Sequence, residues 1–227
     1  MAWLCIVPIV LSAACAWPLA AQAVPVAESK VAAPPDALAF ARKLAKEDYV
    51  GWSYGAGESA KTKTIDCTCF LAAVCRELAK ESGKSLDEQT LKGIKVVLSD
   101  EDKQNLQALV EKSDPKTSGV VKALVDAKLG VRIEAKDARA GDLVQYWYRE
   151  GDQWAGHASI IESVSKGKAV MFGSHKTTLK ARADDDAKIA TAKGGIGTGP
   201  TVDLAAKKGR AFVVRWTSPK AVAPTKG

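Results

Sequence analysis

Residues 65–81, with the sequence IDCTCFLAAVCRELAKE, decide how the chain folds around its candidate nucleophile. Apolar residues recur at helical spacing from Phe70 to Leu78, so we expect a helix that is buried along one face and ends before Gly83. Cys67 lies at the start of this helix. A nucleophilic cysteine is often found there, because free N–H groups and the helix dipole stabilise its thiolate. We therefore expect Cys67 to be a nucleophile with a lowered thiol pKa.

The only two histidines of the chain, His157 and His175, lie in a half that has the pattern of β-strands. Alternating and apolar runs predict strands at residues 143–148, 158–164, 169–172 and 211–216, with a hairpin turn at residues 166–168. If this hairpin pairs its two strands, both histidines lie on one face of the sheet. We expect His157 to act as a general base for Cys67 and His175 to orient it.

The rest of the chain predicts helices before the strands. We expect helices at residues 36–48, 99–112 and 119–128, and loops at residues 51–63 and 184–199. The glycine-rich sequence GGIGTG at 194–199 has a superficial likeness to a phosphate-binding loop. It does not lie between a strand and a helix of a βαβ unit, so we interpret it as a flexible loop. Helices followed by an antiparallel meander predict an α+β domain with the helices packed on one side of the sheet.

The first 23 residues contain no charged side chain and end in Ala-Gln-Ala, which predicts a secretory signal peptide cleaved after Ala23. Cleavage after Ala23 is favoured over a lipoprotein site at Cys15, which stays an alternative. Residues 24–35 have the composition of a linker, and residues 219–227 that of a disordered tail. We expect a secreted or periplasmic protein with no transmembrane span in the mature chain.

Composition excludes little and is ordinary for a soluble domain, with a solvated basic surface as the favoured interpretation of its charge. The 33 Lys and Arg against 26 Asp and Glu give a net charge of +7, spread along the chain, which is compatible with a polyanionic envelope surface as a partner. No arginine-rich stripe or known motif predicts nucleic-acid binding. Cys67, Cys69 and Cys75 remain after the signal peptide, and their odd number indicates a free thiol. Their spacing on one helix disfavours a zinc site, so we expect no metal and no cofactor.

Five motifs in series carry a resemblance to a known family. They are WSYGAG at 52–57, DCT at 66–68, AGDLV at 140–144, GHASII at 156–161 and FGSH at 172–175. In their order and spacing they resemble the NlpC-type, papain-like cysteine peptidases of bacterial cell walls, over residues 40–216. The resemblance implies one peptidase domain at residues 36–218, with a longer insertion at about 84–136.

The resemblance also implies roles for individual residues. Cys67 resembles the nucleophile, His157 the general base and His175 the orienting third residue. The backbone N–H of Cys67 would contribute to an oxyanion hole, with Trp52, Tyr54 and Asp66 as weaker candidates for positioning the substrate. The chain departs from the family pattern at Trp52, Ala56 and Cys69, where the family has tyrosine, glycine and glycine.

Three functions stay open at this point. The leading hypothesis is a hydrolase that cleaves amide bonds in peptidoglycan stem or cross-bridge peptides through Cys67, His157 and His175. The second is an amidase or acyl transferase of the same fold that acts on another substrate, such as a secreted antibacterial toxin. The third is a non-catalytic module that binds the cell wall. Reaction of Cys67 with iodoacetamide separates the first two from the third.

Overall fold

The computed structural model describes residues 36–176, 194–205 and 210–217. The expected signal peptide at 1–23, the linker at 24–35 and the tail at 219–227 lie outside the described residues. Six α-helices lie within the described part of the chain: α1 Ala37–Glu47, α2 Cys67–Glu81, α3 Glu88–Ile94, α4 Asp100–Gln104, α5 Leu106–Glu111 and α6 Val120–Asp126. Two 3-10 turns, η1 Pro115–Thr117 and η2 Ala135–Asp137, lie on either side of α6.

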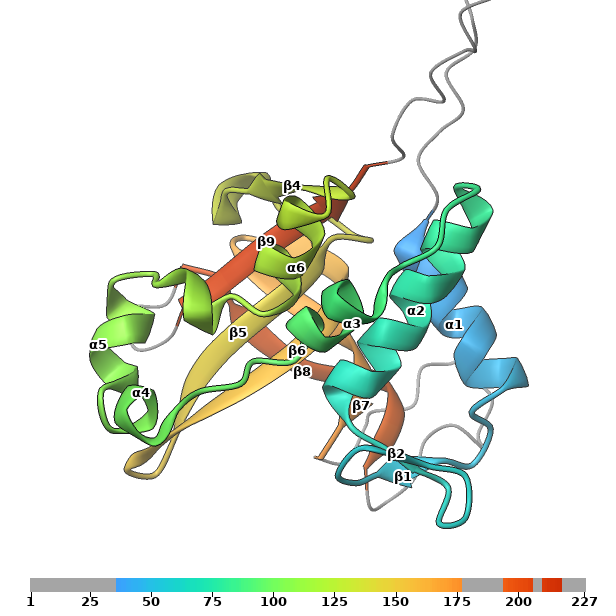
Figure 1. Ribbon diagram of the computed structural model, residues 1–227, viewed down its shortest axis with the longest axis horizontal. Helices are drawn as coiled ribbons and strands as arrows, with labels where there is room; N and C mark the ends of the chain where they lie inside the picture. The colour runs from blue at the N-terminus through green and yellow to red at the C-terminus, as the bar shows by residue number, and fades with distance from the viewer. Residues whose placement is uncertain (1–35, 177–193, 206–209, 218–227) are drawn as a thin grey trace, which may run out of the picture. The chain divides into compact units, whose positions relative to one another are not determined.

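The strands form two sheets. The small one contains β1 Ser53–Tyr54, β2 Glu58–Ser59 and β3 Thr64–Ile65, which leads directly into α2. The large one contains β4 Gly130–Ile133, β5 Leu143–Glu150, β6 Gln153–Ser165, β7 Lys168–His175, β8 Gly195–Asp203 and β9 Arg210–Trp216. Its order is β4-β9-β5-β6-β7-β8, and every neighbouring pair is antiparallel. The structure therefore confirms an α+β fold with N-terminal helices packed against an antiparallel sheet (Figure 1).

Local sequence explains where the two long helices begin. The side chain of Asp36 accepts a hydrogen bond from the N–H of Leu38 at 2.9 Å, and α1 starts at Ala37, directly after Asp36. Asp66 caps α2 in the same way through the N–H of Cys69. A carboxylate at this position satisfies N–H groups that have no partner within the helix, so both helices start at a defined residue.

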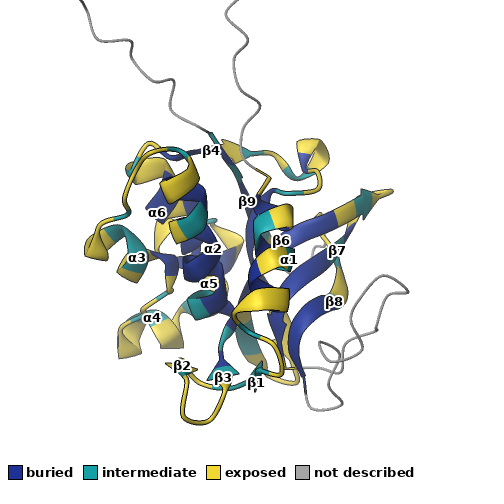
Figure 2. Ribbon diagram, turned by 90° about the vertical axis from the view of Figure 1, so that its right-hand side faces the viewer, coloured by how far each residue is buried: buried dark blue, intermediate teal, exposed yellow. Residues whose placement is uncertain are grey.

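The hydrophobic core lies between the helices and one face of the large sheet. Phe70 and Leu78 of α2 belong to the same buried cluster as Leu143, Ile160 and Phe172 of the sheet. A smaller cluster, which includes Val144, Tyr146, Ile161 and Met171, lies on the opposite face. Figure 2 shows the middle of β6, most of β7 and the first part of β8 buried, whereas the outer surface of α1 is exposed. Successive side chains of each central strand thus alternate between two buried layers.

Several expected elements are confirmed and three are corrected. The loop expected at 51–63 contains the short strands β1 and β2, which pair with β3 in the small sheet. The four expected strands lie within β5, β6, β7 and β9, and the helices expected at 36–48, 65–81 and 119–128 are α1, α2 and α6. The single helix expected at 99–112 is wrong, because the chain breaks at Asn105 into α4 and α5. Asparagine is a weak helix former, and here its ψ of 11° interrupts the helix.

The loop expected at 184–199 is wrong for residues 195–199, which form the first half of β8. Backbone pairing with β7 holds these residues in the sheet: Gly197 pairs with Gly173 and Gly195 with His175. Residues 184–193 lie outside the described part of the chain. Within the described residues, no helix combines the length and apolar character that crossing a membrane requires.

Candidate active site

Asp66 fixes the start of α2 and the loop in front of it. Its carboxylate accepts hydrogen bonds from the Cys69 N–H at 2.7 Å, the Thr68 hydroxyl at 2.8 Å and the Gly57 N–H at 2.9 Å. Burial by itself raises the pKa of Asp66, but these hydrogen bonds outweigh burial and hold the pKa below its usual value. Asp66 is therefore a charged N-cap that ties the loop at Gly57 to the first turn of the helix.

Cys67 is the first residue of α2 and is buried, with 8% of its surface exposed. Burial raises the pKa of its thiol to about 11; the N–H groups of Ala158 and Thr68 oppose the rise, and the Asp66 carboxylate adds to it. The lowered thiol pKa expected from the helix start is thus wrong for this environment, because desolvation of the thiolate outweighs the helix dipole. The influence of the Ala158 N–H places the Cys67 sulfur against β6, one residue beyond His157.

The two histidines lie together, as the hairpin predicts. Extending the pairing of Ile160 with Phe172 by three residues along both strands brings His157 opposite His175. Nε2 of His157 lies 3.0 Å from Nδ1 of His175, a hydrogen-bonding distance, and the two rings stack with their centroids 4.9 Å apart.

Burial keeps both imidazole rings neutral at neutral pH. It lowers the pKa of His157 to about 4, against the opposing effect of the Asp66 carboxylate. Burial, followed by the charge of His157, lowers the pKa of His175 to about 3. The site therefore rests as a neutral thiol beside neutral imidazoles, rather than as the thiolate–imidazolium pair that a lowered thiol pKa would give.

A direct hydrogen bond joins β7, which carries His175, to β3, which precedes α2. The hydroxyl of Ser174, which precedes His175, donates to the carbonyl oxygen of Ile65 at 2.7 Å. Ile65 ends β3, two residues before Cys67. This buried hydrogen bond couples the position of β7 to the start of α2, so the elements that carry His175 and Cys67 cannot move independently.

A cavity of about 530 Å³ opens beside the histidines. Its walls include His157, His175 and the three tyrosines Tyr54, Tyr146 and Tyr148. Tyr146 pairs with His157 across β5 and β6, with ring centroids 5.4 Å apart. Burial raises the pKa of Tyr54 to about 12, and the Cys67 thiolate is the next cause, which places Tyr54 near the sulfur. The cavity is thus walled by aromatic rings and phenol groups.

Trp52 and Tyr54 lie in different environments. Tyr54 lines the cavity. Trp52 instead packs edge-on against Tyr49, with ring centroids 4.9 Å apart, and it joins the hydrophobic core. Its position between Tyr49 and the core gives it a packing role. Asp66 acts through the helix start and is not among the residues that line the cavity.

Gly199 of β8 shapes the space around His175. A Cβ atom at Gly199 would lie less than 3.0 Å from three ring atoms of His175, whereas ordinary contacts begin at 3.4 Å. Only glycine lets the edge strand lie this close to the imidazole. The glycine-rich stretch that resembles a loop in sequence is therefore the wall against which the His175 ring packs.

The other two cysteines of α2 have different environments. Cys75 is completely buried in the core, and Cys69 is half-buried on the side of the helix that lines a separate groove. Cys67, Cys69 and Cys75 are all free thiols. In the described part of the chain, no group of three or more His, Cys, Asp or Glu side chains is arranged to hold a metal ion.

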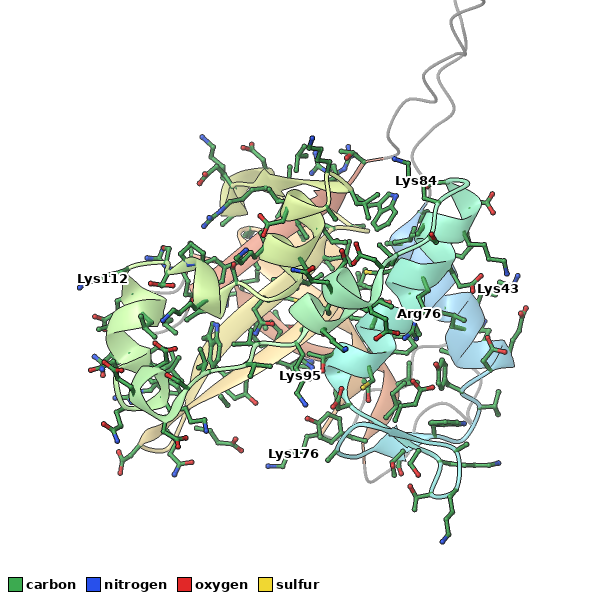
Figure 3. All side chains as sticks on the ribbon, in the orientation of Figure 1. Lys43, Arg76, Lys84, Lys95, Lys112 and Lys176 are labelled. Atoms are coloured by element: carbon green, nitrogen blue, oxygen red, sulfur yellow. The ribbon has the colours of Figure 1, made fainter. Side chains whose placement is uncertain are left out.

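The surface cations are spread over the molecule. Figure 3 shows Lys43, Arg76, Lys84 and Lys95 over the helices and Lys112 at the far end, near α5. Lys176, which follows β7, is the labelled cation that also lines the cavity. No protein-family model matches this chain, and no curated protein is similar to it in sequence.

Proposed function

We propose that this protein is an exported cysteine hydrolase of the papain-like NlpC type, which cleaves amide bonds in peptidoglycan stem or cross-bridge peptides. One observation carries the proposal. Cys67, at the start of a helix, lies against the strand of His157, and Nε2 of His157 lies 3.0 Å from Nδ1 of His175. This is the arrangement of a nucleophile, a base and an orienting group.

The chemistry starts from a neutral thiol. Nδ1 of His157 accepts the thiol proton as the Cys67 sulfur attacks the amide carbon, and a tetrahedral intermediate forms. The C–N bond then breaks, and His157 passes the proton to the leaving amine. Water, deprotonated by His157, attacks the resulting thioester, releases the carboxylic acid and restores the thiol. His175 holds the ring of His157 through Nε2, so that Nδ1 stays available.

Two groups are suited to stabilise the developing oxyanion. The backbone N–H of Cys67 belongs to the first helical residue, so it has no acceptor within the helix. The phenol of Tyr54 lines the cavity and is the second donor in the proposal. Donors of this kind reduce the barrier because they are already oriented toward the charge that develops in the transition state.

The location and substrate rest on sequence. The uncharged segment at residues 1–23 supports export, and the net charge of +7 supports attraction to a polyanionic envelope. Peptidoglycan stem and cross-bridge peptides are the amide substrates that an exported hydrolase meets there. The aromatic walls of the cavity offer contact area for a short peptide.

The test is digestion of purified peptidoglycan, with the fragments identified by mass spectrometry. The wild-type protein should release new peptide termini, and Cys67→Ala should release none while keeping the thermal stability of the wild type. Cys69→Ala is the matched control, because it removes a half-buried thiol two residues away on the same helix. Activity lost in Cys69→Ala and kept in Cys67→Ala would refute Cys67 as the nucleophile.

Alkylation by iodoacetamide separates the alternatives. If peptidoglycan is not cleaved but Cys67 reacts much faster in the wild type than in His157→Ala, His157 activates the thiol and the protein is an enzyme of the same class with another substrate. If Cys67 reacts equally fast in both, the non-catalytic wall-binding function is the correct one.

A further inference from the structure

Two buried polar atoms beside the histidine pair have no hydrogen-bond partner among the residues that the structure describes. They are Nε2 of His175 and Oγ of Ser159, and these two residues are 2% and 1% exposed. Buried polar groups in folded proteins are nearly always bonded, because leaving one without a partner costs about 1 to 3 kcal/mol. Two such atoms near each other therefore indicate that something joins them.

The proposed reaction decides which protons the two rings carry. Nδ1 of His157 must be free to accept the Cys67 proton, so the proton of neutral His157 lies on Nε2 and is donated to Nδ1 of His175. Since Nδ1 of His175 is then an acceptor, its own proton lies on Nε2. That N–H points into a buried region and requires an acceptor there.

Gly173 provides the space for such a connection. Ser159 and Gly173 lie on neighbouring strands, and an added Cβ on Gly173 would lie 3.1 Å from Oγ of Ser159 and 3.8 Å from Nε2 of His175. These two polar atoms are thus both within reach of one position just above Gly173. A water molecule needs two or more polar partners to occupy a buried site, and this position offers two.

We propose that Ser159 is a positioning residue, which accepts the Nε2–H of His175 through one bound water held over Gly173. The proposed hydrogen-bonded series then runs from Nε2 of His157 through the ring of His175 and the water to Ser159. Ser159, at the end of this series, favours the Nε2–H tautomer of His175. That tautomer in turn favours the Nε2–H tautomer of His157. The inference rests on the proposed function for its catalytic meaning, but the tautomers can be measured without any substrate.

The chain suits this measurement because it contains only two histidines, and both belong to the site. The experiment is NMR of the untagged protein with ¹⁵N-labelled histidine at neutral pH, where long-range ¹H–¹⁵N correlations identify the protonated nitrogen of each ring. In the wild-type protein, both rings should carry their proton on Nε2. A proton on Nδ1 of His175 would overturn the proposal at once.

Ser159→Ala and Gly173→Ala test the two parts of the connection. The first removes the acceptor, and the second fills the position of the water with a methyl group. Each should convert a measurable fraction of both rings to the Nδ1–H tautomer and reduce kcat about 5- to 10-fold with KM unchanged, as expected for the loss of one hydrogen bond. Ser163→Ala, which removes an exposed hydroxyl from the same strand, is the matched control and should change neither.

The outcomes separate this inference from the proposed function. If Ser159→Ala keeps both rings in the Nε2–H form, Ser159 is not the acceptor, whether or not the wild type hydrolyses peptidoglycan. If Ser159→Ala changes the tautomers and Gly173→Ala does not, the bridging water is wrong. If both variants change the tautomers while the wild type cleaves nothing, the connection stands and the proposed substrate fails.

Discussion

Substitution of Gly199 by alanine tests whether the edge strand holds the orienting histidine in place. The added Cβ would lie less than 3.0 Å from three ring atoms of His175, at least 0.4 Å inside the 3.4 Å at which ordinary contacts begin. His175 is only 2% exposed, so either its ring turns or β8 moves outward. A shift of about 0.5 Å already takes the 3.0 Å bond between His157 and His175 to the limit of hydrogen bonding.

The expected loss of activity follows from this displacement. A reacting group misplaced by about 1 Å can cost roughly 100-fold in rate, so we expect kcat/KM of Gly199→Ala to fall between about 10- and 100-fold. Overpacking should cost about 1 to 3 kcal/mol of stability, which leaves the protein folded at room temperature. The assay is the initial rate of fragment release from peptidoglycan, with thermal unfolding measured in parallel.

Gly93→Ala is the control for a glycine that is not crowded. Its added Cβ would lie 3.4 Å from the Ala123 Cβ, an ordinary contact, and alanine is favoured over glycine within α3. Gly93 is the residue before the last one of α3, so the gain from alanine is small there, and this variant should keep full activity and equal or slightly higher stability. The reasoning fails if Gly199→Ala keeps full activity and also leaves the ¹⁵N spectrum of the two histidines unchanged.

Four further predictions concern the same site and its support. Burial lowers the pKa of His157 to about 4 and raises the pKa of Cys67 to about 11, so kcat/KM should stay constant through neutral pH and decrease near these two pH values. A decrease of kcat/KM near pH 6.5 would contradict these protonation states. The unfolded chain protonates His157 first, so the free energy of unfolding, measured with urea, should decrease as the pH falls below 6.5. The rate of peptidoglycan hydrolysis should fall less in His175→Ala than in His157→Ala, and least in His175→Asn, because the third residue orients the base without moving the proton. Equal losses in the three variants would contradict this order. Arg215→Ala removes the guanidinium that contacts the buried Asp142 carboxylate at 2.8 Å, and urea unfolding should show a loss of about 3 kcal/mol, partly restored by Arg215→Lys.

The sequence by itself determined the parts of this protein that depend on short-range pattern. The helical spacing of Phe70 to Leu78 predicts α2, and the capping carboxylate of Asp66 places its start next to Cys67. The apolar and alternating runs predict β5, β6, β7 and β9, and the hairpin turn predicts that His157 and His175 meet. Each of these features follows from residues that are close in the chain and carry a strong local preference.

Long-range contacts decided the rest. Residues 195–199 have the composition of a loop, yet they form β8 because their backbone pairs with β7 and their missing side chains leave room for the His175 ring. Tyr146 and Tyr148 were not expected in the site. Their alternate positions on one predicted strand indicate that they share one face of the sheet. Only the pairing of β5 with β6 brings them beside His157.

The protonation states of the site also depended on tertiary structure. A cysteine at a helix start favours a thiolate when the surroundings are ignored, and the sequence indicates nothing more. Once α2 packs against β6, Cys67 and both histidines keep only a small exposed fraction. Burial penalises every charged form, and here this penalty exceeds the stabilisation by the helix dipole, so the pKa of Cys67 moves in the direction opposite to the one that the sequence predicts.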